Sequence, residues 1–310
     1  MTRFFISTTL ALAAVHAGAA DFTSSAAGTT AADFLNLGVG ARAAAMGGAY
    51  SAVADDATAL YWNPAGLTRV LDRSATVMHA AYIASSYFDY GAYAQNFGSY
   101  GALGLGVQYF SAGSVNETDA AFNPIGTVTP YDLAASIGYA YKFDSLGGIS
   151  VGVTGKYIES KLADSAKTEA LDAGLLSPAY LDGNLRLAIT MRNLGRAIKY
   201  DQTPEQLPLV FGAGGAYRIT SNWLVALDVD APKNNNPYAN IGTEYLLVGG
   251  KSWRFAGRAG YSSQTAQGIT GFTGASIGIG IGYEGMNVDY AFVPYGSVGT
   301  AQRISLTYNF

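Results

Sequence analysis

The chain has 310 residues, a formal net charge of −4, 49% hydrophobic residues and only 13% charged residues. Soluble domains carry about 25% charged residues, so much of this surface is not expected to face water. The 13% of aromatic residues argues against a disordered chain. The absence of cysteine excludes disulfides and thiolate metal sites, and the slightly acidic balance provides no basic surface for nucleic acid.

The first twenty residues have the pattern of a secretory signal peptide. Arg3 provides a positive charge, Phe4 to Val15 form an apolar stretch, and Ala17 to Ala19 provide small residues for cleavage. The apolar stretch is too short to span a bilayer. We therefore assign residues 1–20 to a cleaved signal peptide. An exported, hydrophobic chain is then either an unusual periplasmic or secreted β-domain or a closed membrane barrel.

Residues 21–70 are rich in Ala and Gly and do not follow a strand pattern. Asp55 or Asp56 is expected to cap a short helix that runs to Tyr61, and Asn63-Pro64 is expected to end it. Small residues allow close packing of the backbone, as a plug folded inside a barrel lumen would require. A loose periplasmic extension is the alternative interpretation of this segment.

Residues 71–310 show repeated alternation of apolar and polar side chains, which is typical of strands whose two faces meet different surroundings. The chain is therefore predicted to be an all-β membrane protein, an antiparallel transmembrane β-barrel of about 14 strands. Each strand is about long enough to cross a hydrocarbon core at a tilt. The predicted strands are 74–84, 87–97, 100–111, 130–143, 148–160, 166–177, 183–193, 208–219, 222–231, 236–248, 252–262, 272–283, 286–294 and 301–310. The strand at 166–177 has the weakest pattern.

The connections between these strands alternate between long and short, except at Ser85-Ser86, where a long link is expected and a short one occurs. Outer-membrane barrels have short periplasmic turns and longer extracellular loops. A sheet in lipid must close on itself, because each unpaired backbone group costs several kcal/mol there. The pattern therefore places the chain in the outer membrane with both ends on the periplasmic side, in contact with outer-membrane lipid.

Charged residues in the strands are expected to face the lumen, because Arg or Lys on the lipid face at mid-bilayer costs about 2–4 kcal/mol. The alternation gives this orientation to Arg186, Arg192, Arg254, Arg258, Glu244 and Asp289. The last strand ends with Tyr308 and Phe310, and this terminal aromatic pattern resembles the signal that barrels present to the outer-membrane assembly machinery.

Catalysis and metal binding have little support in the sequence. His79 is the one histidine after the predicted leader, and no G-x-S-x-G nucleophile motif accompanies it. Asp55-Asp56 lacks the spacing of a calcium-binding loop, and the glycines of 212–215 have no following helix to form a phosphate loop. We expect these glycines to relieve crowding where strands curve around the plug. The chain is thus expected not to be an enzyme and to need no metal or cofactor.

Several motifs together resemble the PorV/PorQ family, which belongs with FadL-like outer-membrane barrels. The matching segments are 38–42, 46–49, 54–57, 62–67, 192–195, 207–208, 289–294 and 303–306. They span nearly all of the chain after the leader, which makes the match far more specific than an isolated Asn-Pro-Ala-Gly-Leu. Within the N-terminal segment the motif residues, to which we assign a structural or gating role, are Gly40, Arg42, Met46, Gly47, Asp55, Asp56, Asn63, Pro64 and Gly66.

The resemblance implies a fourteen-stranded barrel with an N-terminal hatch. It also implies an accessory or shuttle role in type IX-like protein secretion, with secreted cargo proteins and secretion-system components as partners. FadL-type relatives instead pass small hydrophobic molecules through an opening in the barrel wall, and this role is the first alternative. A structural outer-membrane protein without transport is the second.

Overall fold

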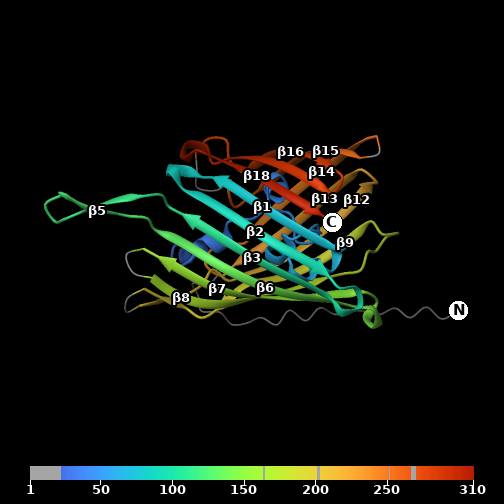
Figure 1. The fold of residues 1–310 in the computed structure, drawn as a ribbon, viewed down its shortest axis with the longest axis horizontal. Helices are drawn as coiled ribbons and strands as arrows, with labels where there is room; N and C mark the ends of the chain where they lie inside the picture. The colour runs from blue at the N-terminus through green and yellow to red at the C-terminus, as the bar shows by residue number, and fades with distance from the viewer. Residues whose placement is uncertain (1–21, 163–164, 201–202, 251, 267–269) are drawn as a thin grey trace.

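Fourteen strands close into one antiparallel barrel in the computed structural model (Figure 1). The structure describes residues 22–162, 165–200, 203–250, 252–266 and 270–310, so the predicted leader lies outside the described residues. The predicted all-β barrel is confirmed, and every predicted strand coincides with an observed one. In chain order the barrel strands are β1 (Arg73–Ala81), β2 (Tyr87–Asn96), β3 (Ala102–Ser111), β6 (Tyr131–Phe143), β7 (Ile149–Lys161), β8 (Ser165–Leu176), β9 (Leu185–Gly195), β12 (Val210–Thr220), β13 (Trp223–Pro232), β14 (Tyr238–Gly249), β15 (Trp253–Ser262), β16 (Ala275–Tyr283), β17 (Met286–Pro294) and β18 (Thr300–Asn309).

Closure of the barrel joins the first strand to the last. β1 pairs with β18 in a continuous register from Ser74 opposite Asn309 to Ala81 opposite Gln302. Side chains alternate between the two surfaces along each strand, so that in β18 Ile304 and Leu306 are exposed on the outside while Arg303 and Ser305 are buried inside. This arrangement satisfies the backbone and places the apolar side chains toward lipid.

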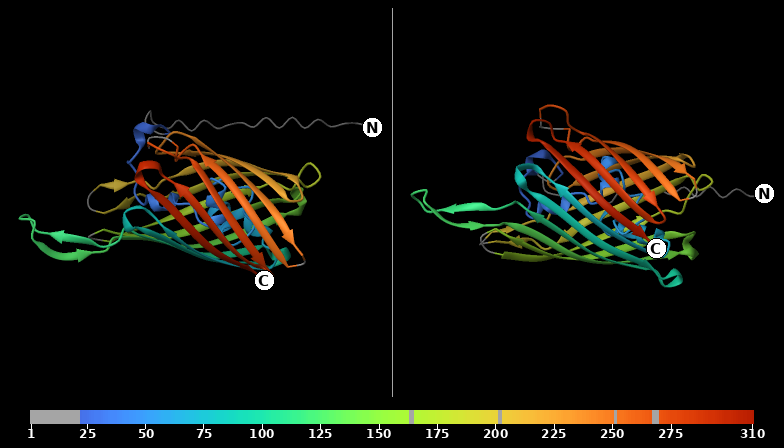
Figure 2. Two further views of the ribbon diagram at one scale, coloured as in Figure 1. Left: turned by 90° about the horizontal axis from the view of Figure 1, so that it is seen from above. Right: turned by 45° about the horizontal axis from the view of Figure 1, so that its top comes forward.

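The two ends of the barrel differ, and we call them the loop end and the turn end. The turn end carries the short connections and the C-terminal residue Phe310, and in outer-membrane barrels such an end faces the periplasm. At the loop end, the link between β3 and β6 forms a hairpin, β4 (Val115–Thr118) with β5 (Pro124–Val128), that stands well clear of the barrel (Figures 1 and 2). A second small pair, β10 (Ile198–Lys199) with β11 (Pro204–Glu205), lies in the link between β9 and β12.

Residues 22–70, which we call the plug, begin at the mouth of the loop end, beside the link between β13 and β14, and continue into the barrel (Figure 2). Their helices are short: α1 (Ala41–Ala45), α2 (Ala59–Trp62) and the 3-10 turns η1 (Ser24–Ala26), η2 (Asp33–Asn36) and η3 (Pro64–Arg69). Four further 3-10 turns lie between strands: η4 (Ile83–Ser85), η5 (Gly98–Tyr100), η6 (Asp144–Leu146) and η7 (Gly296–Val298). Within the described residues, no helix has both the length and the apolar character needed to cross a bilayer.

Small residues let the plug and the wall approach each other closely. A Cβ atom added to Gly152 of β7 would overlap the backbone of Pro64 and Ala65, and one added to Gly260 of β15 would overlap that of Met46. Of the 212–215 glycines, Gly214 approaches the plug, because a Cβ there would overlap the Ser51 side chain, whereas Gly212 and Gly215 approach only residues of the wall. The wall therefore has a surface shaped to the plug backbone.

The local structure around α2 differs in part from the expectation. The helix does end at Trp62, as Asn63-Pro64 predicted, and the Asn63 side chain accepts a hydrogen bond from the Ala65 N–H at the start of η3. The prediction of an aspartate cap is wrong for Asp55, which faces arginine side chains instead. Asp56 accepts a hydrogen bond from the N–H of Thr58, the residue before the helix, at 2.8 Å.

Candidate functional site

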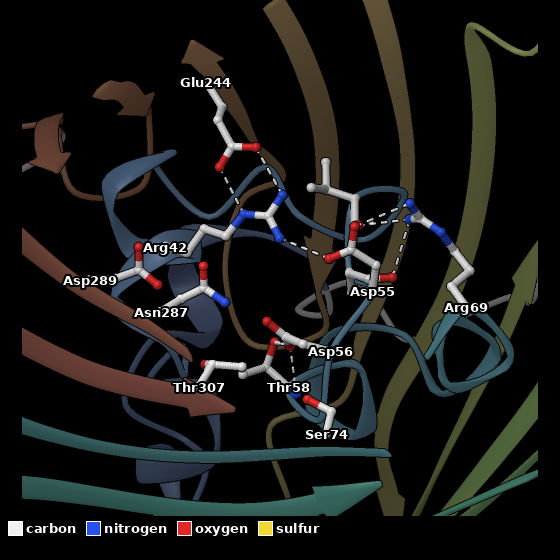
Figure 3. A network of polar contacts seen from close by, with 12 residues as sticks. Arg42, Asp55, Asp56, Thr58, Arg69, Ser74, Glu244, Asn287, Asp289 and Thr307 are labelled. Carbon is white, nitrogen blue, oxygen red and sulfur yellow. Dashed lines mark hydrogen bonds and ion pairs between the residues drawn. The ribbon is translucent and has the colours of Figure 1, made fainter. Parts of the chain in front are cut away.

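Arg42 of α1 connects the plug to the barrel wall (Figure 3). Its Nε and Nη2 atoms each donate to one carboxylate oxygen of Glu244 on β14, both at 2.8 Å, and its Nη1 donates to Asp55 at 2.8 Å. The Glu244 side chain is only 3% exposed, and that of Arg42 is 22% exposed. Two parallel bonds from one guanidinium to one carboxylate are among the strongest charge-assisted hydrogen bonds in proteins.

The same carboxylates extend these contacts in both directions. On the wall, Arg258 of β15 donates to Glu244 at 2.6 Å and to Asp289 of β17 at 2.7 Å. In the plug, Arg69 lies 3.4 Å from Asp55 and donates to the backbone carbonyl of Val53 at 2.7 Å. We call the whole set the plug–wall ion-pair chain, and its members in order are Arg69, Asp55, Arg42, Glu244, Arg258 and Asp289.

The electrostatic environment separates two adjacent aspartates of the plug. Burial by itself would raise the pKa of Asp55, but Arg42 and Arg69 outweigh it and hold that pKa below 3.8. The pKa of Asp56 is raised, because this carboxyl is buried and lies beside the charge of Asp55. Burial also lowers the pKa of Arg42, yet the neighbouring carboxylates outweigh it and leave a pKa well above the ordinary value. Of the two adjacent aspartates, Asp55 is therefore the one that carries the negative charge within the ion-pair chain.

Further hydrogen bonds attach the plug to other strands. The Asn63 amide donates to the carbonyls of Ser51 in the plug at 3.0 Å and of Leu175 in β8 at 3.2 Å. The Asp228 carboxylate of β13 accepts from the backbone N–H groups of Tyr50 and Ser51 at 3.0 and 2.8 Å. The plug is therefore tied to strands on several sides of the lumen.

The plug lies between two cavities that share no lining residue. The loop-end cavity has a volume of about 470 Å³, and its lining includes the rings of Tyr61, Trp62 and Tyr82. The turn-end cavity has a volume of about 770 Å³, and its lining includes Arg42 and Glu244. Both cavities hold charged side chains, and the plug divides one from the other.

The predicted lumen charges lie in these interior regions. Arg192 forms an ion pair with Asp230 at 3.0 Å beside the loop-end cavity. Arg258, Glu244 and Asp289 belong to the ion-pair chain, whereas Arg186 and Arg254 line the turn-end cavity without an ion pair among the described residues. The structure also contains an ion pair that we did not predict, between Lys156 of β7 and Asp172 of β8 at 2.6 Å. The sequence did hold a signal for Asp172, because strict alternation along β8 places its side chain on the lumen face.

The remaining motif residues have structural positions in the plug or at the barrel seam. Gly40 has a φ of +82°, Met46 is fully buried, Gly47 approaches Tyr261 of the wall, and Gly66 approaches the Ala54 carbonyl. Pro64 starts η3. Tyr308 and Phe310 lie on the outer surface with stacked rings 4.9 Å apart.

His79 lies on the outer face, paired with Asp89 at 2.7 Å. Among the described residues, no group of three or more His, Asp or Glu side chains could hold a metal ion.

Comparison with known proteins supports the fold. The Ralstonia pickettii toluene transporter TbuX aligns with a TM-score of 0.54 at 13% identity, over 88% of this chain and 98% of that chain. The Pseudomonas putida toluene transporter TodX and a Pseudomonas aeruginosa FadL homologue each align with a TM-score of 0.55, at 13% and 12% identity, over the same shares of the chains. No curated protein matches the chain.

The closed barrel, its internal plug and these structural neighbours define the fold as a FadL-like barrel. The profile of the family described as "Type IX secretion system protein PorV" matches residues 21–234. The chain belongs to the PorV family, as its motifs indicated.

Proposed function

We propose that this protein is an accessory component of type IX-like secretion that binds secreted or secretion-system proteins at its loop end. The observation that carries the proposal is the divided lumen: the plug is joined to the wall by buried ion pairs, so the interior is suited to a stable scaffold rather than a wide channel. Membership of the PorV family supports the same role.

The β4–β5 hairpin is the part of the loop end best suited to a protein partner. Phe122 and Ile125 are 87% and 66% exposed, and both hairpin edges offer unpaired backbone groups. Such an edge can add a strand from a partner, with neighbouring side chains giving specificity. The residues from 112 to 130 include Glu117 and Asp119 but no Lys or Arg. We therefore expect an extended partner segment of neutral or basic character.

The proposal is tested by replacing residues 115–128 with a short Gly-Ser turn. We expect the variant to reach the outer membrane as a folded barrel but to lose co-purifying proteins and to show a secretion defect. A variant with Phe122→Ser and Ile125→Ser separates the apolar contacts from the loop length. Normal secretion and an unchanged set of co-purifying proteins in both variants would rule out this role for the hairpin.

A second candidate is the diffusion of small hydrophobic molecules, as in the toluene transporters with a similar fold. One observation favours it: the pairing of β8 with β9 shifts register between Leu171 and Ala173, close to Asn193, which has a φ of +64° and donates to the Pro208 carbonyl. A shifted ladder is where a wall could open. Toluene uptake into liposomes tests this role, and uptake equal to that of empty liposomes would refute it.

A further inference from the structure

The turn-end cavity contains a set of arginines that the ion-pair chain does not neutralise. Six arginines and four carboxylates line this cavity, an excess of two positive charges. The ion-pair chain already balances three of these arginines, Arg42, Arg69 and Arg258, against the carboxylates of Asp55, Glu244 and Asp289. The imbalance therefore falls on the arginines outside the chain, which are Arg186, Arg218 and Arg254.

Two of these arginines lie on neighbouring strands. Arg186 of β9 pairs with Ala216 of β12, two residues before Arg218 on the same face of that strand. Arg69 of the plug turn η3 lines the same cavity beside them. The Arg186 guanidinium forms no hydrogen bond or ion pair with any described residue. Among the described residues the Arg218 guanidinium donates only to the Ser221 carbonyl, at 3.3 Å. The nearby Asp55 is already bound by Arg42 at 2.8 Å and by Arg69 at 3.4 Å.

The geometry points to an oxyanion-binding site in the turn-end cavity, formed by Arg186 and Arg218 with Arg69 beside them, for a ligand that carries phosphate or carboxylate groups. A guanidinium matches these groups with two parallel hydrogen bonds and keeps its charge at any physiological pH. A multivalent anion would also remove the repulsion among the three arginines. The site is distinct from the loop-end hairpin and does not depend on the proposed secretion role.

The size and position of the cavity fit such a ligand. Its volume of about 770 Å³ lies in the range of about 300–1,000 Å³ that holds small molecules. Because it lies at the turn end, a ligand would enter from the periplasmic side. The low-dielectric wall of the barrel strengthens the field of the arginines inside. Asn184 and Asn222 also line the cavity and provide neutral polar groups beside the charges.

The test is isothermal titration of the detergent-purified protein with inorganic pyrophosphate and with citrate, at low and at high ionic strength. A third titration uses micelles doped with phosphatidic acid, which distinguishes a lipid headgroup from a free anion. The variants are Arg186→Gln and Arg218→Gln. Arg196→Gln is the matched control, because Arg196 follows the same strand β9 at the opposite end of the barrel and is exposed. Heat-modified migration on gels verifies that each variant folds. If one of the two site variants fails to fold, the other still tests the proposal.

We expect wild type and Arg196→Gln to bind with the same affinity, and each site variant to bind about tenfold more weakly or worse, since a hydrogen bond to a charged group contributes about 1.5–3 kcal/mol. Binding should weaken as salt is added. Binding of phosphatidic acid alone, lost in the site variants, would assign the oxyanion to a lipid headgroup. Equal affinity in all variants, or no binding of any of the three anions to wild type at low salt, would overturn the proposal.

Discussion

The Glu244→Gln variant is the most direct test of the plug–wall ion-pair chain. Glu244 accepts hydrogen bonds from Arg42 at 2.8 and 2.8 Å and from Arg258 at 2.6 Å, and its side chain is 3% exposed. Glutamine keeps the shape of the side chain but removes the charge that holds two arginines together. The two guanidinium groups then lie close to each other with no shared anion between them.

Loss of one partner from a buried ion pair costs about 3–5 kcal/mol. Asp55 and Asp289 still bind Arg42 and Arg258 in the variant, so we expect the lower end of this range, about 3 kcal/mol. That energy changes the folding equilibrium constant by more than a hundredfold. Urea unfolding of the barrel in lipid vesicles measures the loss of stability, and planar-bilayer conductance measures whether the plug has loosened.

Glu205→Gln is the matched control for this experiment, because Glu205 is an exposed glutamate of the loop-end pair β10–β11. We expect Glu244→Gln to unfold at lower urea and to conduct more often than Glu205→Gln. A double-mutant cycle with Arg42→Gln should give a coupling of about 1–3 kcal/mol between Arg42 and Glu244. Equal unfolding midpoints for the two glutamate variants, or zero coupling, would refute the reasoning.

Three further perturbations address the close packing and the buried charges. Gly152→Val should cost about 1–3 kcal/mol of unfolding free energy by displacing the plug, whereas Gly257→Val should not, because Gly257 faces open space. Urea unfolding compares the two variants, and equal midpoints would contradict the packing argument. Asp55→Asn should lose about 1 kcal/mol of unfolding free energy at pH 7, and this loss should disappear as the pH falls through the depressed pKa of Asp55. Asp56→Asn should lose no stability at pH 7, because the pKa of Asp56 is raised. Thermal melts over a range of pH compare the two variants, and identical pH profiles would contradict the assignment of the charge to Asp55. Lys156→Met leaves the buried carboxylate of Asp172 without its cation and should cost about 3–5 kcal/mol of unfolding free energy. The same urea assay measures this loss, and an unchanged midpoint would show that the ion pair does not contribute to stability.

The barrel could be predicted from the sequence because lipid and lumen impose opposite demands on alternate residues. In β18 this alternation is continuous, and its predicted range of 301–310 agrees with the observed Thr300–Asn309. In β8 the outward side chains near the loop end include Lys167 and Glu169, which weakened the sequence pattern although exposed and buried side chains alternate along most of the strand. The β4–β5 hairpin was not predicted, because it lies beyond the hydrocarbon core, where no such alternation is required.

The partners within the candidate site could not be predicted in the same way. Alternation gives the side of the wall on which Glu244 and Arg258 lie, but their contact depends on the register that sets them opposite each other in β14 and β15. The approach of Arg42 depends on the path of the plug, which no period in the sequence describes. Composition could indicate that arginines and carboxylates share the lumen, but not that Arg186 would have no ion pair with the residues that the structure describes.

The helices of the plug are too short to be stable on their own. Its α-helices have five and four residues, far below the length of about 12–15 residues at which an isolated helix becomes marginally stable in water. Its order must therefore come from the wall, through close contacts such as Gly152 with Pro64 and the bond from Arg42 to Glu244. A buried charged contact requires its partner to be in place, so it favours one position of the plug over others that apolar packing alone would tolerate. Any displacement of the plug from this position would consequently break the Arg42–Glu244 contact.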